Sequence, residues 1–319
     1  MCAFKITKLT LSAGLISLLI MLKPTLVFSQ EDALSSEPSD IISKNLLLDI
    51  ALSGNAVLAV GERGHVIRST NCGLTWQQII VPTRSTLNSI FFLNDKLGWS
   101  VGHDSVILKT QDGGKNWKQI YKDSKAEQPL LDVLFISEKK GFAVGAYGAL
   151  LTTQDGGGTW ETGPIYGEDD FHLYRISYSM DGDLLVTGEA GSIYLSNNQG
   201  SDWHKIKSPY QGTFFGNQIL TNGKLLVFGM RAHLYASEDL GQNWFQIQLP
   251  MDTSLEDSLI TKTGEIVIVG ASGVVMKGND NGKHFTILPQ ANKSHLAGLI
   301  QCGGKILSVG EKGVQQVIE

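Results

Sequence analysis

The sequence predicts an all-β protein, a seven-bladed β-propeller, because one unit recurs seven times along the chain. In each unit an apolar run ends on a glycine, and successive glycines are 40 to 43 residues apart. A constant period of this length, with several short strands in each unit, is typical of propeller blades, none of which can bury its apolar faces alone. The repeated glycines are Gly61, Gly102, Gly145, Gly188, Gly229, Gly270 and Gly310.

A second motif, S/T-x-D/N-x-G-x-x-W, follows the first six of these glycines at a constant distance. Its hydroxyl and its carboxylate or carboxamide can bond backbone N–H groups of a tight turn, and its glycine accepts a positive φ. Its aromatic residue begins the next strand and can pack between neighbouring blades. This motif is the Asp-box, and we expect a structural role for Asn71, Trp76, Asp112, Trp117, Asp155, Trp160, Asn198, Trp203, Asp239, Trp244, Asp280 and Phe285.

Each unit can be divided into four short strands, A to D, in chain order. In the second unit these are residues 87–92, 98–101, 106–109 and 117–120. A turn of the form G-x-x-G joins strands B and C in five of the seven units. Strands of this length, bounded by Gly, Asn, Asp and Ser, are what a blade built from hairpins requires.

Three segments are expected along the chain. Two lysines precede a short apolar run and a possible cleavage point after residue 29, which is typical of a secretory signal peptide; an uncleaved N-terminal anchor is the alternative. A polar leader follows, and the remaining length fits one propeller without a second domain. The expected segments are 1–29 (signal peptide), 30–45 (leader) and 46–319 (propeller).

The seventh unit has no Asp-box and stops after its third strand, residues 314–318. An uncovered strand edge is a liability in a sheet. Residues 40–43 of the leader, Asp-Ile-Ile-Ser, have the short apolar character of a strand D. We therefore expect them to pair with residues 314–318 and close the ring.

Without the signal peptide the chain carries 23 basic and 31 acidic residues, a net charge of −8. This charge argues against binding to nucleic acid, which needs a cationic surface, and against strong binding to a membrane surface. We expect an exported monomer, either periplasmic or secreted.

Two cysteines remain after the signal peptide, Cys72 in the first Asp-box and Cys302 at the A–B turn of the seventh unit. Blades one and seven are neighbours in a closed ring, so a disulfide is conceivable in an oxidising compartment. An A–B turn lies nearer the axis than a C–D turn, however, and a disulfide needs Cα atoms within about 7 Å. Two buried thiols are therefore the expected state.

Two regions are candidates for binding. Polar residues just before the central apolar residue of strand A are expected to line the axial channel, where they either hold a small ligand or only tolerate water. The long D–A loops should share a face with the B–C turns and mix aromatic with charged side chains, as binding loops do. The channel candidates are Asp49, Asp132, Arg175 and Asn217, and the partner-binding candidates are Arg63, Arg84, Tyr166, Asp169, His172 and Tyr210.

No catalytic, metal or cofactor site is expected. Asp-boxes also occur in sialidase-type glycoside hydrolases, but these need a cluster of arginines and a tyrosine–glutamate pair. The five arginines of this chain are scattered, and its histidines occur singly rather than in metal-binding groups. Its glycine-rich turns are each followed by a strand, whereas a phosphate-binding loop leads into a helix.

Three sequence forms occur together in the second and third units. They are L-x-D-V-x-F at residues 130–135, G-W/F-x-V-G at 98–102 and 141–145, and I/L-x-x-T-x-D-G-G-x-x-W after each of the latter. In this combination the chain, over residues 46–319, resembles the photosystem II stability and assembly factor family of lumenal seven-bladed propellers.

The resemblance implies a non-enzymatic factor that binds membrane-protein subunits from the periplasmic side, or from the thylakoid lumen in a photosynthetic host. The family is known for an arginine-rich surface patch, which the scattered arginines here do not supply. The alternative functions are a sialidase-like glycoside hydrolase and a carbohydrate-binding propeller.

Overall fold

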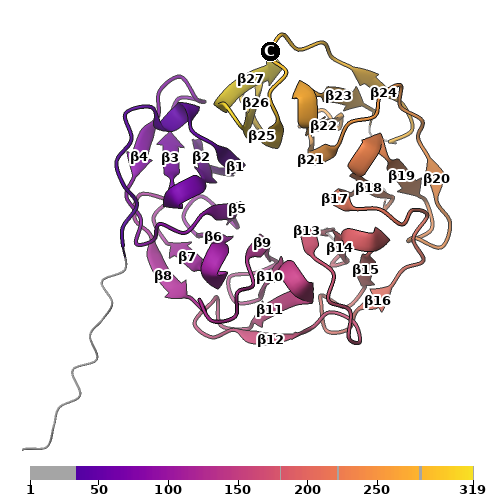
Figure 1. Cartoon of the computed structure of the whole chain (residues 1–319), viewed down its shortest axis with the longest axis horizontal. Coiled ribbons are helices and arrows are strands. Elements are labelled where there is room, and N and C mark those ends of the chain that lie inside the picture. Colours follow the sequence, from indigo (N-terminus) through magenta and orange to yellow (C-terminus); the bar gives the residue numbers. More distant parts are fainter. Residues whose placement is uncertain (1–33, 180, 221–222, 280–281, 319) are drawn as a thin grey trace, which may run out of the picture. The chain divides into compact units, whose positions relative to one another are not determined.

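A computed structural model describes residues 34–179, 181–220, 223–279 and 282–318, and it confirms the predicted seven-bladed β-propeller. Seven antiparallel sheets stand around a central axis, with strand A of each blade nearest the axis (Figure 1). The described residues contain no α-helix, only short 3-10 turns. The predicted signal peptide and Asp280 lie outside the described residues.

Six blades have four strands and the seventh has three, always in the order A-B-C-D from the axis outward. The A strands are β1 (Leu47–Ser53), β5 (Leu87–Phe92), β9 (Leu130–Phe135), β13 (Leu173–Tyr178), β17 (Phe214–Ile219), β21 (Leu255–Ile260) and β25 (Leu296–Cys302). The B strands are β2 (Ala56–Gly61), β6 (Gly98–Gly102), β10 (Gly141–Gly145), β14 (Leu184–Gly188), β18 (Leu225–Gly229), β22 (Ile266–Gly270) and β26 (Lys305–Gly310).

The outer strands are shorter. The C strands are β3 (Val66–Ser69), β7 (Ile107–Thr110), β11 (Ala149–Thr153), β15 (Ile193–Ser196), β19 (Leu234–Ser237), β23 (Val275–Gly278) and β27 (Gly313–Ile318). The D strands are β4 (Gln77–Ile79), β8 (Lys118–Tyr121), β12 (Glu161–Pro164), β16 (His204–Lys205), β20 (Phe245–Gln246) and β24 (Phe285–Ile287). The 3-10 turns are η1 (Ile42–Lys44), η2 (Glu62–Gly64), η3 (His103–Ser105), η4 (Ala146–Gly148), η5 (Glu189–Gly191), η6 (Met230–Ala232) and η7 (Ala271–Gly273).

The repeated glycine at the end of strand B is required by a close approach of backbone. At Gly145 a Cβ atom would lie 2.2 Å from the carbonyl oxygen of Pro129, where the chain enters strand A of the same blade. The same crossing occurs at Gly61, with Leu46. Any side chain here would push strand A away from strand B. This explains why glycine recurs at this position in every unit.

The Asp-box turns share one hydrogen-bond pattern. In the second blade the Thr110 hydroxyl donates to Asp112 Oδ1 at 2.9 Å and accepts from the Gly114 N–H at 3.0 Å. Asp112 Oδ1 also accepts from the Asn116 N–H at 2.9 Å. The corresponding bonds form in the first, third, fourth and fifth blades.

The aromatic residue of each Asp-box packs against the preceding blade. Trp117 of the second blade is buried among Leu58 and Val60 of the first, and Trp160 of the third lies edge-on to Phe135 beside Trp99 of the second. Trp76 of the first blade packs with residues of the seventh. Each sheet is thus fixed to its neighbour through the motif that the sequence repeats. Trp117 is buried, whereas the other Asp-box aromatics are half-buried.

The D–A loops and B–C turns share one face, as predicted. A Cβ atom on Gly148 in η4 would lie 2.4 Å from the carbonyl oxygen of Asp169, and the same holds at 2.2 Å for Gly64 and Thr83. The A–B and C–D turns meet at the opposite face, where the Gly113 N–H donates to the Lys96 carbonyl. We call these the B–C face and the C–D face.

The predicted closing strand is wrong. In the described residues β27 pairs only with β26, and residues 42–44 form η1 instead of a strand. The carbonyl oxygen of Ser43 lies 2.0 Å from the position of a Cβ on Gly313, which is the place that a D–A loop occupies in the other blades. The leader therefore replaces the missing D–A connection, but it does not supply strand D.

The rest of the leader lies along the outer strand of the first blade. Ser36 exchanges hydrogen bonds with the backbone of Val81, and the Gln78 side chain bonds the backbone of Glu37 and Ser39. These bonds direct the chain away from β27. Because that strand lacks a cover, its Val314, Val317 and Ile318 are only partly buried.

The two cysteines form a disulfide, so the expectation of free thiols is wrong. The Cα atoms of Cys72 and Cys302 are 5.5 Å apart, although 230 residues separate them in sequence. The two turns were expected to lie at different distances from the axis. They meet because the Asp-box turn of the first blade lies over the seventh blade. A Cβ on Gly73 would be 2.9 Å from Leu307, and Trp76 packs in the same cluster. The bond joins the two ends of the ring.

Removing this disulfide should destabilise the fold strongly, because a long loop is closed. Replacing both cysteines (Cys72→Ser with Cys302→Ser) should lower the free energy of unfolding by up to about 5 kcal/mol in the chain-entropy description. Urea denaturation of the oxidised proteins measures the difference. Dithiothreitol should lower the wild-type midpoint and leave the double variant unchanged; equal midpoints for the two oxidised proteins would contradict a closing role.

Asp-box aromatics should differ in their contribution to stability according to burial. Trp117→Ala should cost about 3 to 5 kcal/mol, because a buried indole leaves a cavity between two blades. Trp244→Ala should lower the free energy of unfolding clearly less, because Trp244 is only half-buried. Chemical denaturation of both variants checks the ranking, and a greater loss for Trp244→Ala would show that the packing has been misassigned.

Candidate functional site

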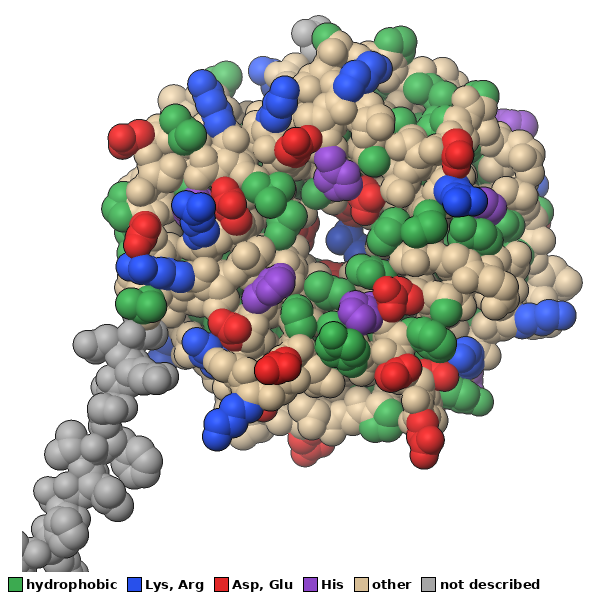
Figure 2. Space-filling view, viewed as in Figure 1, with side chains coloured by type: hydrophobic (Ala, Val, Ile, Leu, Met, Phe, Trp, Pro, Cys, Tyr) green, Lys and Arg blue, Asp and Glu red, His purple; other side chains and the backbone are tan. Residues whose placement is uncertain are grey.

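An axial channel runs between the A strands and opens at the centre of the B–C face (Figure 2). A cavity of about 420 Å³ within it is lined by residues from all seven A strands. The four predicted channel residues, Asp49, Asp132, Arg175 and Asn217, are among them. Figure 2 also shows basic and acidic side chains deep in the opening.

Asp257 of the sixth blade also lines the cavity and was missed from the sequence. It pairs with Val269 just as Asp132 pairs with Val144, after the same β-bulge at the start of strand A. The fifth blade has Gly216 at this position, so Asn217 lies one residue further along. The signal was present in the sequence, since a large apolar residue stands two places before the channel position in every blade.

Three channel carboxylates connect neighbouring blades through backbone N–H groups. Asp49 Oδ2 accepts from Ile90 of the second blade at 2.8 Å, and Asp132 Oδ2 accepts from Ile176 of the fourth at 2.9 Å. Asp257 of the sixth blade likewise accepts from the Leu299 N–H of the seventh blade, at 3.1 Å. Each carboxylate also accepts from the N–H of the residue that follows it.

Arg175 provides the single positive charge among the residues that line this cavity. Its Nη2 atom is 2.5 Å from Asp257 Oδ1, and its Nε atom is 3.8 Å from Asp132 Oδ2. Asp49 has no ion-pair partner of its own in the described part of the chain. Burial raises the pKa of Asp49 to about 7, although Arg175 lowers it, and burial likewise raises the pKa of Asp257.

The predicted partner-binding residues lie on the B–C face but do not form one cluster. Arg84 holds the leader, with an ion pair to Glu37 at 2.8 Å and a bond to the Ser35 carbonyl. Asp169 is paired with Lys205 at 2.6 Å and accepts from the Tyr194 hydroxyl.

Tyr210 is likewise engaged, since its ring stacks on His233 at 3.9 Å. Tyr166 is 46% exposed, and Arg63 stands in η2 with a φ of 54°. Most of these side chains therefore already have partners within the molecule.

Sequence reasoning named His172 but missed the other rings of a group beside the channel opening. Tyr147 is 57% exposed in η4, and its ring centre lies 4.9 Å from His172. His172 is followed by Tyr174 at 6.4 Å, and Tyr174 by Phe215 at 5.2 Å. We call these four residues the aromatic row; it crosses from the third blade to the fifth. Tyr147 was overlooked because it lies within a G-x-x-G turn.

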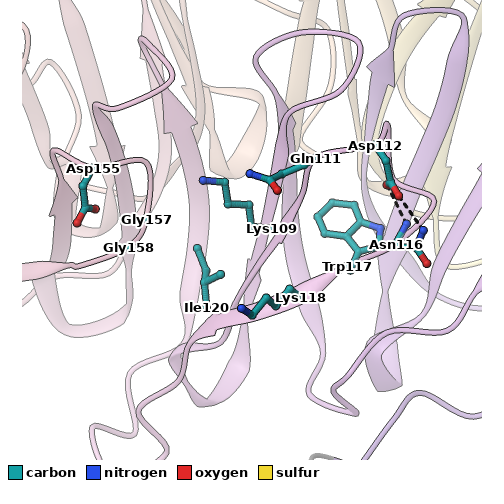
Figure 3. A pocket seen from close by; sticks show the side chains of 10 residues that line it. All are labelled: Lys109, Gln111, Asp112, Asn116, Trp117, Lys118, Ile120, Asp155, Gly157 and Gly158. Carbon is teal, nitrogen blue, oxygen red and sulfur yellow. Dashed lines mark hydrogen bonds between the residues drawn. The ribbon is translucent and has the colours of Figure 1, made fainter.

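A second pocket, of about 470 Å³, lies between the Asp-box turns of the second and third blades (Figure 3). Lys109 Nζ donates to the Gly156 carbonyl at 2.7 Å and lies 5.4 Å from the Trp99 ring centre. Asp112 and Asp155 are occupied by their own turns. Lys109 thus connects the two blades, and the two carboxylates stabilise their own turns.

Two further kinds of feature are absent from the described residues. No helix there is long and apolar enough to cross a membrane. No group of three or more His, Cys, Asp or Glu side chains within the described ranges is arranged to hold a metal ion.

The charge of the channel should make stability depend on pH. The pKa of Asp49 is about 7 in the folded protein, against 3.8 for an ordinary carboxyl. The folded state therefore binds more protons between these values, and the free energy of unfolding should fall as pH rises from about 4 to 7, by at most about 4 kcal/mol. Urea denaturation at several pH values gives the free energy of unfolding of wild type and of Asp49→Asn. The difference between the two isolates the contribution of Asp49. The exposed Asp252→Asn serves as control, and parallel profiles for wild type and Asp49→Asn would overturn the assignment.

Relatives of known identity share parts of this sequence. A photosystem II stability/assembly factor HCF136, chloroplastic, from Cyanidioschyzon merolae is 29% identical over 107 residues, which are 31% of this chain and 24% of that relative. The alignment thus spans about a quarter of the relative's length.

Solved structures share the fold. A structure described as YCF48 bound to D1 peptide has a TM-score of 0.71 at 18% identity, covering 87% of this chain and 94% of that one. A family 74 xyloglucanase from Xanthomonas campestris has a TM-score of 0.68 at 11% identity, covering 85% of this chain and 52% of the enzyme. At these identities the likeness shows the fold alone.

The family comparison is more extensive. Residues 30–127 and 121–244 match the family described as Photosynthesis system II assembly factor YCF48. These two matches cover more than half of the chain, as the repeated blade forms of residues 98–145 led us to expect. The protein therefore belongs to the YCF48 family of photosystem II assembly factors.

Proposed function

We propose that this protein is an exported, non-enzymatic propeller that binds a membrane-protein subunit through its B–C face and acts as an assembly factor. The main support for this proposal is that one part of each blade repeats while another part varies. Every B strand ends on the same glycine and six units have the Asp-box pattern, whereas the residues of the B–C turns and D–A loops differ from blade to blade. The aromatic row belongs to this variable part, and exposed aromatic rings are favoured interface anchors.

Family membership supports a protein partner. A YCF48 structure is described as bound to a D1 peptide, so a propeller of this family binds a peptide segment. For the present chain we infer a partner of the same general kind, a segment of an envelope or thylakoid membrane protein. The acidic surface opposes binding to nucleic acid or to anionic lipid.

Export is supported by the N-terminal sequence and by the cysteine pair. Residues 1–29 have the composition of a signal peptide. Disulfides persist in oxidising compartments, and Cys72 and Cys302 are joined. We therefore place the protein in the periplasm, the thylakoid lumen of a photosynthetic host, or the medium, as a monomer.

Glycoside hydrolysis, the main alternative, finds less support. The channel carboxylates already accept two backbone hydrogen bonds each. Arg175 lies in the channel and Arg84 in a D–A loop, where it binds the leader. Arg63 and Arg231 lie in separate B–C turns. The xyloglucanase shares the architecture at 11% identity, which carries no inference about chemistry.

The binding face can be tested by paired double variants. Tyr147→Ala with Tyr166→Ala removes two exposed rings from the B–C face, while Leu74→Ala with Leu240→Ala removes two exposed apolar side chains from the C–D face. In crosslinking and pull-down from an envelope extract of the source organism, the first pair should reduce partner recovery at least about tenfold, because interface anchors contribute more than about 1 kcal/mol each. The second pair should bind like wild type.

Two results would contradict this proposal. One is loss of partner in the C–D face pair with full recovery in the B–C face pair. The other is turnover of sialoside, xyloglucan or aryl-glycoside substrates by the purified protein.

A further inference from the structure

One carboxylate at the mouth of the channel lacks any partner in the described structure. Glu256 is the second residue of β21, the position held by Tyr174 in β13 and Phe215 in β17. Its side chain is half-buried, and no hydrogen bond or ion pair to a described residue reaches it. Burial, and then the nearby charge of Asp257, raise the pKa of Glu256 to about 7. A desolvated carboxylate without a partner is costly, and a cation would relieve that cost.

The surroundings of Glu256 suit an organic cation. Phe215 occupies the equivalent position in the neighbouring blade, and its ring meets Tyr174 edge-to-face at 5.2 Å. The charge of Glu256 is felt at Tyr174, whose pKa rises to about 12 through burial first, then through Glu189 and Glu256. Aromatic faces beside a carboxylate attract ammonium and guanidinium groups, and they also cover the apolar stem of a long basic side chain.

The channel below adds a negative field. Asp49, Asp132 and Asp257 occupy the same position of their A strands, and Arg175 is the one basic residue among those that line the cavity. A narrow opening lined mainly by one sign of charge concentrates the opposite sign at its mouth. Anionic groups are repelled there, and no group of three or more metal-binding side chains lies among the described residues. A basic side chain satisfies both the charge and the aromatic walls.

We propose that the partner segment bound on the B–C face places a lysine or arginine side chain in the channel mouth, with its charge at Glu256 and its stem along Phe215 and Tyr174. This inference rests on the proposed protein-binding function and specifies the chemistry of the partner. The arginine-rich patch for which the family is known would bind acidic segments, whereas the channel mouth of this chain should bind a basic one.

A library of random peptides displayed on phage tests the chemistry without knowledge of the partner. Wild-type protein and the Glu256→Gln, Phe215→Leu and Glu138→Gln variants are immobilised in parallel and selected against the same library. Glu138→Gln makes the same change of charge at an exposed position on the C–D face. Unfolding midpoints of all four proteins are measured first; Glu256→Gln should be at least as stable as wild type, because it removes an unpaired, half-buried charge.

Clones selected on wild type should be enriched in lysine or arginine and should compete with one another. Their peptides should bind Glu256→Gln at least about tenfold more weakly and Phe215→Leu several-fold more weakly, and should bind Glu138→Gln as they bind wild type. Clones that lose binding in the Tyr147→Ala, Tyr166→Ala double variant, but show no basic enrichment and bind Glu256→Gln normally, would overturn this inference and leave the proposed function standing. Absence of selectable clones, or clones indifferent to the double variant, would contradict both.

Discussion

The contact between neighbouring blades is the constraint on which the rest of this structure depends. No four-stranded blade can bury its own faces, so each must pack against the next, and the described residues achieve this at two radii. Near the axis, carboxylates such as Asp132 accept N–H groups from the next blade. Further out, the Asp-box aromatics fill the space over the preceding blade, as Trp117 does. Both devices fix the angle between sheets and leave the B–C face free to vary.

Ring closure shows how this constraint is met where the repeat fails. The seventh blade has no strand D in the described residues, and its outer strand β27 is only partly covered. The seam is held instead by the Cys72–Cys302 disulfide, by Trp76 packing on the seventh blade and by the leader at Gly313. A disulfide and a short loop thus take the place of the hydrogen-bonded strand D that the other six blades have.

The sequence predicts those features that depend on local chemistry. The glycine at the end of strand B and the hydroxyl–carboxylate pair of the Asp-box each impose a conformation within a few residues, so their period reveals the blades. The features that the sequence did not predict are contacts between residues that are far apart along the chain. The leader follows the first blade because of bonds to Gln78 and Val81, and the disulfide forms because the Asp-box turn of the first blade lies over the preceding, seventh blade. Spacing along the chain can reveal neither contact.

The candidate site was predicted in part for the same reason. Asp49, Asp132 and Arg175 follow from strand alternation. Asp257 was missed although it stands two places after Leu255, just as Asp132 stands two places after Leu130. Tyr147 occupies a turn position with a φ of 55°, a conformation that favours glycine, and nothing local marks its ring as exposed. The loop residues chosen for their chemistry, Arg84 and Asp169, are instead used to hold the leader and Lys205.

We propose that a partner protein binds to the B–C face, beside the channel mouth. Photo-crosslinking in the source organism tests it most directly, with a photoreactive amino acid placed either at Tyr147 or at Leu74, which is 73% exposed on the opposite face. The account predicts a discrete crosslinked envelope or membrane protein from position 147 and none from position 74. Crosslinks from position 74 alone would show that the partner binds the Asp-box side and would contradict the account.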